Sequence, residues 1–261
     1  MLLTFDVGNS ETTLGLFEGE TLRAHWRLTT DVPRTADELG VLLRGLLAKA
    51  DIALEQVQGV AIGSVVPRVT QPLVDACRGW LPVQRIEVFD ATSPLPITLA
   101  VDEPRTVGAD RIINTLVASR RFGRDAIVVD LGTATTFDCI TKDAVFLGGV
   151  IAPGVRTSAE TLFRRTSKLP ATELVAPART LGTNTEDCIR AGVMFGAAES
   201  IDGIVRRLMA EWPGTERPMV IATGGLAELF APICNCFDVV DPYLTLRGLA
   251  LAFQLVGQEG G

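Results

Sequence analysis

Two short segments of the chain each place an acid, a glycine and several hydroxyl groups directly after an apolar run. The first reads DVGNSETTLGLF from residue 6, and the second reads DLGTATTFDCI from residue 130. Each apolar run predicts a buried strand, and the Asp-x-Gly turn predicts a hairpin with exposed N–H groups at its tip. Such a tip suits a phosphate group together with its counter-cation. One copy would be an ordinary turn, whereas two copies favour a duplicated phosphate-binding hairpin.

The two acids of these hairpins, Asp6 and Asp130, have an alternative role as turn residues that bond to their own backbone. Both follow apolar strands directly. Because an unpaired carboxylate is costly to bury, we expect each to lie beside a cation or a ligand.

A third acid, Asp110, follows Gly108 and Ala109 at the start of a predicted helix. From these residues alone the favoured role of Asp110 is a helix N-cap. If the chain transfers a phosphoryl group to an alcohol, a base must accept the hydroxyl proton, and Asp110 is then the candidate for it. The adjacent Arg111 suits a substrate carboxylate, and its alternative is a surface ion pair. Thr185 could cap the helix after it.

Composition excludes several classes of function. The 261 residues include 24 Lys and Arg against 31 Asp and Glu, a net charge of −7, and this argues against nucleic acid or an anionic membrane as partner. One histidine and five scattered cysteines leave no set of residues for a His-based triad or a zinc site. No apolar run reaches the roughly 18 residues that span a bilayer, and we expect a cytoplasmic protein.

The order of predicted elements is that of an α/β protein with two similar halves, each opening on a β-hairpin meander. We expect domains at 1–117 and 118–261, with the final helix at about 244–256 a candidate to pack back on the first domain. Residues 148–154 read as a glycine-rich loop after a short strand. Gly192 and Gly196 are expected to mark close packing on a helix over 187–209.

Six motifs occur in an order that one known family shares: Asp6-Val-Gly-Asn-Ser10, Gly108-Ala-Asp-Arg111, Asp130-Leu-Gly-Thr-Ala-Thr-Thr136, Gly148-Gly-Val-Ile-Ala-Pro-Gly154, Lys168-Leu-Pro170 and Gly182-Thr-Asn-Thr185. Together they resemble type III pantothenate kinases, over residue 6 to about 248. The resemblance implies a duplicated actin-like (ribonuclease H-like) ATPase fold of two similar domains with a cleft between them. In that superfamily a late Gly-Gly turn, here Thr223-Gly224-Gly225, lies by the adenosine.

The activity that the resemblance implies is ATP-dependent phosphorylation of pantothenate to 4′-phosphopantothenate, the first step of coenzyme A biosynthesis. It implies that ATP, accompanied by Mg²⁺, is bound by Asp6, Val7, Gly8, Asn9, Ser10, Glu11, Thr12, Thr13 and Thr133. It implies that pantothenate is bound by Gly108, Ala109, Asp110, Arg111 and Thr185. Asp110 would be the proton acceptor, and Asp130 would hold a monovalent cation, K⁺ or NH₄⁺. The family is a homodimer with active sites at the subunit interface.

Two positions depart from the family pattern. Ser10 stands where threonine is usual, and it keeps the hydroxyl. Val101 stands where many members carry a tyrosine, so a tyrosine contact to the substrate is lost. One alternative is another small-molecule kinase of the superfamily, which would lack Gly108-Ala-Asp-Arg111. The other is a non-catalytic regulatory relative, but the presence of Asp6, Asp110 and Asp130 argues against a loss of catalysis.

Overall fold

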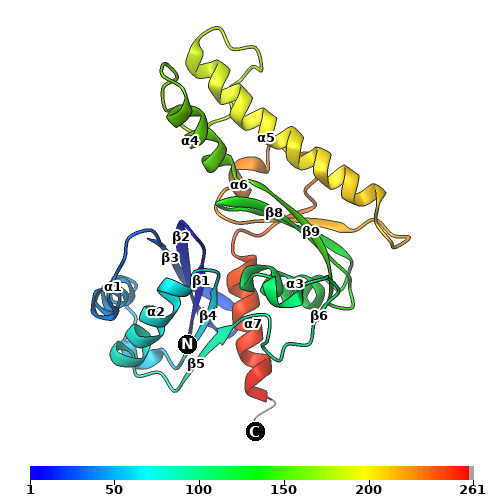
Figure 1. The fold of residues 1–261 in the computed structure, drawn as a ribbon. Helices are drawn as coiled ribbons and strands as arrows, with labels where there is room; N and C mark the ends of the chain where they lie inside the picture. Colours follow the sequence, from blue (N-terminus) through cyan, green and yellow to red (C-terminus); the bar gives the residue numbers. More distant parts are fainter. Residues whose placement is uncertain (259–261) are drawn as a thin grey trace. The chain divides into compact units, whose positions relative to one another are not determined.

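The computed structural model describes residues 1–258 and divides them into two compact units (Figure 1). The first unit contains Met1–Val117 together with the last helix, α7 (Leu244–Gln258), and the second contains Ala118–Tyr243. The final helix therefore belongs to the first unit, although it follows the second in sequence.

The sheet of the first unit is built from a three-stranded antiparallel meander and two parallel strands. Its strand order is β3-β2-β1-β4-β5. The strands are β1 (Leu2–Val7), β2 (Glu11–Glu18), β3 (Thr21–Thr29), β4 (Gly59–Ser64) and β5 (Arg85–Phe89). β4 and β5 each run parallel to their inner neighbour, as expected where a helix connects successive strands.

The second unit repeats this sheet strand for strand. Within a six-stranded sheet, the five strands of this unit lie in the order β9-β8-β7-β10-β11, with the same antiparallel and parallel pairings. The strands are β7 (Ala126–Leu131), β8 (Ala134–Ile140), β9 (Val145–Pro153), β10 (Met219–Thr223) and β11 (Val239–Val240). The duplication predicted from the two Asp-x-Gly hairpins is confirmed, because β1 and β7 hold equivalent central places.

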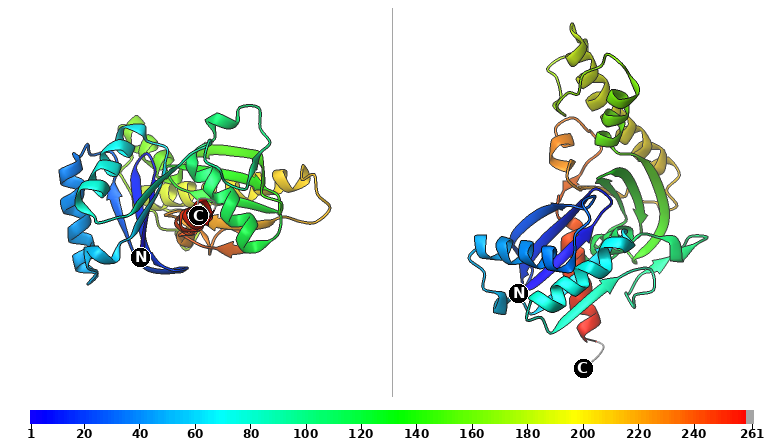
Figure 2. Two further views of the ribbon diagram at one scale, coloured as in Figure 1. Left: turned by 90° about the horizontal axis from the view of Figure 1, so that it is seen from below. Right: turned by 60° about the vertical axis from the view of Figure 1, so that its left-hand side comes forward.

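Helices cover both faces of the first sheet (Figure 2). Leucines of α1 (Ala36–Lys49) and α2 (Pro67–Trp80) pack with Leu3, Phe5 and Val7 on one face. α7 covers the other face, where glycines of the strands let it approach closely. A Cβ at Gly59 would meet the Phe253 ring at 2.5 Å, and one at Gly63 would meet Leu249 at 3.1 Å.

α1 begins with a local hydrogen-bond pattern that its residue types favour. The Thr35 side chain accepts from the Glu38 N–H, and the Glu38 carboxylate accepts from the Thr35 N–H, which is a capping box. The remaining elements of the first unit are short, apart from α3 (Ala109–Phe122), which leads into the second unit. They are 3₁₀ turns at Leu54–Gln56 and Pro104–Thr106 and the two-residue strand β6 (Thr98–Leu99).

The helices of the second unit are α4 (Val155–Arg165), α5 (Thr185–Ala210) and the short α6 (Ala227–Phe230). The loop expected at 148–154 is wrong, because these residues continue β9 to Pro153. Pairing with β8 extends to Pro153, opposite Ala134, and a register shift between Cys139 and Ile140 accommodates Gly148 at φ +111°. Glycines in a strand often mark such an irregularity, which sequence patterns read as a loop. No helix within residues 1–258 is long and apolar enough to cross a membrane.

Candidate active site

Asp6 lies near the carboxyl end of β1, on the sheet face that α7 covers. In the sheet it lies opposite Thr13 of β2 and Gly63 of β4, so their side-chain positions share that face. A Cβ at Gly63 would lie 3.9 Å from the Cβ of Ala109, the first residue of α3. The start of α3 therefore lies next to Gly63, which is the sheet neighbour of Asp6.

The start of α3 brings Asp110 into this region. A Cβ at Gly108 would lie 2.5 Å from Asp110 Oδ1, so the carboxylate folds back over the glycine. Asp110 is the second residue of the helix rather than the residue before it, and the N-cap role is wrong. Its Oδ1 accepts the Arg111 N–H at 2.9 Å, so the carboxylate lies in the first turn, where a helix favours negative charge.

Burial raises the pKa of both acids, and the charge of Asp110 adds to the shift of Asp6. Asp6 is half-buried as a residue, but its carboxyl group is enclosed, and desolvation together with the Asp110 charge raises the Asp6 pKa to about 7. Desolvation also raises the pKa of Asp110, although the Arg111 N–H and guanidinium oppose it. Two carboxyl groups that share an enclosed site in this way are typical of acid–base chemistry near neutral pH.

The tip of the first hairpin divides the predicted ATP residues into structural and exposed groups. The Gly8 N–H donates to Glu11 O at 3.0 Å and closes the turn. Val7 is fully buried, and the buried Thr12 hydroxyl lies 2.8 Å from that of Thr30. Asn9 and Glu11 are exposed at the tip, and Ser10 and Thr13 are half-buried. Val7 and Thr12 thus shape the loop, and Glu11 at its tip pairs with Arg27 of β3 at 3.8 Å.

The second unit repeats the arrangement around Asp130. This residue lies opposite Thr136 of β8 and Thr223 of β10, which gives a row of three oxygen-bearing side chains on one sheet face. Thr223 is 1% exposed, and its Oγ1 has no hydrogen-bond partner within residues 1–258. Gly224 has φ +88°, and a Cβ there would collide with Asp130 Oδ1. Only glycine fits beside this carboxylate.

The tip of the second hairpin is held by the start of α4. The Gly132 N–H donates to Ala134 O at 3.0 Å, which closes the turn as in the first hairpin. The Thr157 hydroxyl of α4 donates to Thr133 O at 2.8 Å. A Cβ at Gly154 would collide with the backbone oxygens of Gly132 and Thr133. The exposed Thr133 side chain is therefore presented by a fixed backbone.

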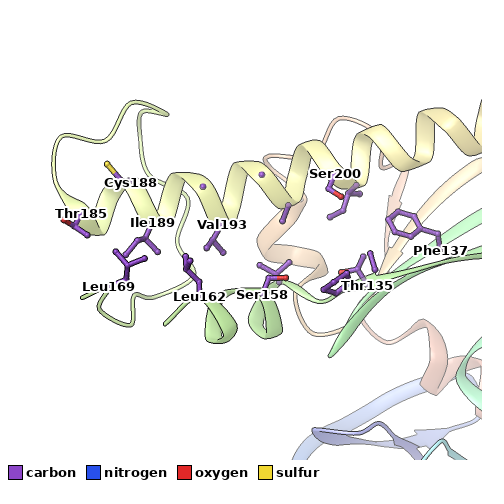
Figure 3. Close-up of a pocket in the computed structure, with 17 residues that line it drawn as sticks. Thr135, Phe137, Ser158, Leu162, Leu169, Thr185, Cys188, Ile189, Val193 and Ser200 are labelled. Carbon is purple, nitrogen blue, oxygen red and sulfur yellow. The ribbon is translucent and has the colours of Figure 1, made fainter. Parts of the chain in front are cut away.

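Thr185 is the first residue of α5. The cap of that helix is Asn184, whose side chain accepts from the Asp187 N–H at 2.9 Å, so the cap role weighed for Thr185 is wrong. Its exposed side chain lines a groove of about 660 Å³ between α4 and α5 (Figure 3). Ile189 and Val193 of α5 face Leu162 of α4 across this largely apolar groove.

Gly192 and Gly196 lie on the groove side of α5 and are exposed. A Cβ at either would meet nothing within 4 Å. The close packing expected of these glycines within the chain is therefore absent among the described residues.

Within residues 1–258 no three His, Cys, Asp or Glu side chains cluster in a way that could hold a metal ion. The oxygen donors of the two hairpins are instead single carboxylates flanked by hydroxyl-bearing strand residues. This donor set suits hard cations that keep waters or bind neutral oxygens, and not a transition metal.

Comparison with known proteins gives consistent matches over nearly the whole chain. The model of the type III pantothenate kinase family matches residues 2–207. The type III pantothenate kinase of Moorella thermoacetica is 45% identical over 255 residues, covering 97% of this chain and 99% of that protein. That of Roseiflexus sp. is 46% identical over 255 residues, covering 98% and 99%.

Solved structures share the fold at low sequence identity. A Campylobacter jejuni protein described as a Baf family transcriptional activator has a TM-score of 0.62 at 18% identity, covering 98% of this chain and 99% of its own. The ethanolamine utilization protein EutJ of Carboxydothermus hydrogenoformans has a TM-score of 0.52 at 18% identity, covering 95% and 88%. The duplicated actin-like ATPase fold expected from the motifs is confirmed.

Proposed function

The chain belongs to the type III pantothenate kinase family, and we propose that the carboxylates of Asp6 and Asp110 carry the kinase reaction in this protein. The reaction is the ATP-dependent phosphorylation of pantothenate to 4′-phosphopantothenate, the first step of coenzyme A biosynthesis. The observation that supports the residue assignment is that Asp6 is enclosed and lies near the charge of Asp110 at the start of α3, and desolvation together with this charge raises the Asp6 pKa to about 7.

Asp110 is proposed as the general base. It accepts the proton of the pantothenate hydroxyl as that oxygen attacks the γ-phosphorus of ATP, the bond to the β,γ-bridging oxygen breaks, and ADP leaves. Desolvation gives Asp110 a higher pKa than a surface aspartate, which makes its carboxylate a stronger base. The neighbouring Arg111 is proposed to bind the pantothenate carboxylate through its planar guanidinium. Gly108, Ala109 and Thr185 are proposed as further pantothenate contacts because they match the family motifs.

ATP is proposed to bind through Asp6 to Thr13 and Thr133. The hairpin tips supply N–H groups and hydroxyls to the phosphates. The divalent metal that accompanies ATP, Mg²⁺, neutralises charge on the phosphate oxygens when bound, and Asp6 would hold it through its waters. All five cysteines are free thiols, which suits action in the reducing cytoplasm, where ATP is abundant.

The direct test of this function is ADP release by the purified protein with Mg²⁺-ATP and pantothenate in KCl. We expect ADP to form only when pantothenate is present, in amounts equal to the phosphopantothenate produced. ADP release with a sugar or acetate in place of pantothenate would assign another kinase activity. No release with any acceptor would favour a non-catalytic regulatory relative.

A monovalent cation, K⁺ or NH₄⁺, is proposed to bind at Asp130. The buried Thr223 hydroxyl, opposite Asp130 in the sheet, supports this cation site. It has no hydrogen-bond partner among the described residues, so its oxygen is available as a ligand for the cation. Gly224 leaves space for the Asp130 carboxylate, which a larger residue there would displace. When bound, the cation offsets the charge of Asp130 near the phosphates.

We predict that KCl raises the melting temperature above its value in NaCl by about 2–4 °C, in the absence of substrates. Thr223→Val should abolish this difference, because valine keeps the shape of the side chain and removes its oxygen. Thr135→Val is the matched control, since Thr135 is a buried threonine on the opposite face of the same sheet. Equal melting of the wild type in both salts would contradict the cation site.

A homodimer that uses the groove between α4 and α5 is also proposed. Gly192 and Gly196 leave the floor of this groove open, and Leu162 on its rim is 36% exposed. Small residues spaced four apart on an exposed helix face allow a second helix to approach closely. Because Thr185 lines the same groove, a second subunit seated there would lie beside a proposed pantothenate contact.

We predict that Gly196→Leu leaves the subunit folded but converts the dimer to a monomer of 27.9 kDa with reduced activity. The added side chain meets open space within the chain and would obstruct a partner. Gly45→Leu, at an exposed and equally open position of α1, is the control and should remain dimeric. Light scattering gives the mass, and a wild type that is monomeric and fully active at assay concentration would contradict the shared site.

A further inference from the structure

A buried amide lies one helical turn after Asp110 on α3. Asn114 is 1% exposed, and its Nδ2 has no hydrogen-bond acceptor within residues 1–258. Buried donors in folded proteins are almost always paired, with protein or with ordered water. The unpaired nitrogen of Asn114 therefore calls for an acceptor that protein contacts alone do not supply.

The orientation of this amide is fixed by α7. The Thr245 hydroxyl, itself 6% exposed, donates to Asn114 Oδ1 at 3.0 Å. A Cβ at Gly248 would lie 2.5 Å from the Ile113 side chain, so α7 and α3 are packed tightly at this point. With its oxygen held by Thr245, the amide presents its two N–H donors on the other side.

Asn114 is four residues after Asp110 on α3, and this spacing places its two N–H donors on the side of Asp110. Residues i and i+4 lie on one face of a helix, and side chains lean toward the helix N-terminus. Asn114 therefore leans toward the turn that holds the Asp110 carboxylate. Amide and aspartate side chains at this spacing hydrogen-bond in helices.

The ionisable groups on the elements packed around this place are few. Asp6 lies on β1, Arg111 is next to Asp110 on α3, and Arg247 follows Thr245 on α7, while β4 carries none. Desolvation dominates the environment of Asp110, so a donor that stabilises its charged form has a large effect on its proton affinity.

We propose that Asn114 is a positioning residue, whose Nδ2–H donates through one buried water to the Asp110 carboxylate and holds it ready to accept a proton. A water at this point has the polar partners that buried waters need. The proposal rests on the role of Asp110 given above for its bearing on catalysis, but the contact itself is a property of the free enzyme.

The test is a ¹³C NMR titration of the Asp110 carboxyl in the free enzyme, assigned by its absence in Asp110→Asn. Asn114→Leu should raise the titration midpoint by about one pH unit, because a donor to a charged acceptor is lost. The acid limb of the kcat profile should move upward by the same amount. Thr115→Val is the control, since it removes a neighbouring buried hydroxyl that donates to Arg111 O at 2.8 Å, and it should lower stability without moving the midpoint.

An Asn114→Leu protein that melts lower but titrates as the wild type would overturn the proposal and leave Asn114 a structural residue. If Asn114→Leu does not fold, the same titration is carried out on Thr245→Val. This variant keeps the Asn114 amide but removes the hydroxyl that fixes its orientation. An unchanged midpoint in Thr245→Val would then overturn the proposal, and an upward shift would support it. The titration needs no turnover, so its result stands apart from whether the wild type phosphorylates pantothenate.

Discussion

Asp110→Asn is expected to lower turnover by about 10²–10⁴-fold while the protein remains folded. Asparagine is nearly isosteric and cannot accept the hydroxyl proton of pantothenate. Its Oδ1 can still accept the Arg111 N–H that Asp110 accepts at 2.9 Å. Because Asp110 is inside the helix and not at its cap, no capping energy is lost. Turnover, pantothenate binding and thermal melting are to be measured on the same preparation.

The control for this variant is Asp102→Asn, at an exposed acid in the loop before α3, which should match the wild type in all three measurements. Binding of pantothenate and ATP by Asp110→Asn should persist, because Arg111 and both hairpins are unchanged. A folded variant with near wild-type turnover would remove Asp110 from the catalytic role. The Asp6 pKa should also fall in this variant, since the Asp110 charge is one cause of its elevation.

Asp6→Asn is expected to abolish activity and to stabilise the substrate-free protein above pH 7. In the folded protein the Asp6 pKa is about 7, against an ordinary value of 3.8. Between these values the folded state keeps a proton that the unfolded state has lost, so the free energy of unfolding falls as the pH rises. Below 3.8 the carboxyl group is protonated in both states and has no such effect. Above 7 the full cost remains, on the order of a few kcal/mol.

The measurement is the melting temperature of wild type and variant at pH 4 and pH 8, without ATP or metal. Asp6→Asn should match the wild type at pH 4 and exceed it by several degrees at pH 8. Mg²⁺-ATP should stabilise the wild type at pH 8 and have little effect on the variant. Glu20→Gln, in the exposed turn between β2 and β3, should show no such pH dependence. A variant less stable than the wild type at pH 8 would contradict this prediction. It would show that Asp6 stabilises the fold and is not a group that lowers folding stability in order to bind a ligand.

The location of Asp6 explains why one carboxylate can lower the stability of the free protein and still be needed for activity. Natural sites commonly keep groups that the fold alone would reject, because binding of ligand or metal recovers the cost. Asp6 is enclosed and adjacent to a second acid, and neither circumstance favours folding. A gain in stability together with a loss of activity is therefore the signature that separates a functional acid from a turn residue.

Local pattern was sufficient for most of the fold. The sequence predicts the two Asp-x-Gly hairpins because an apolar run, an acid and a glycine follow one another in the chain. Each of these features acts through residues that are close together in the sequence. The capping box at Thr35 is local in the same sense, because its two partners are three residues apart. The extension of β9 was missed because glycines at 148 and 149 hide a strand whose partner lies elsewhere in the sequence.

Residue order along the chain is enough to predict the duplicated architecture, the positions of the acids and the family to which their motifs point. Only the tertiary structure placed α3 against Gly63, so that Asp6 and Asp110 share one desolvated region. It also left the Thr223 and Asn114 side chains with buried polar atoms that lack a partner among the described residues. Such features depend on burial and on contacts between distant segments, and desolvation has no signature in the order of residues along the chain.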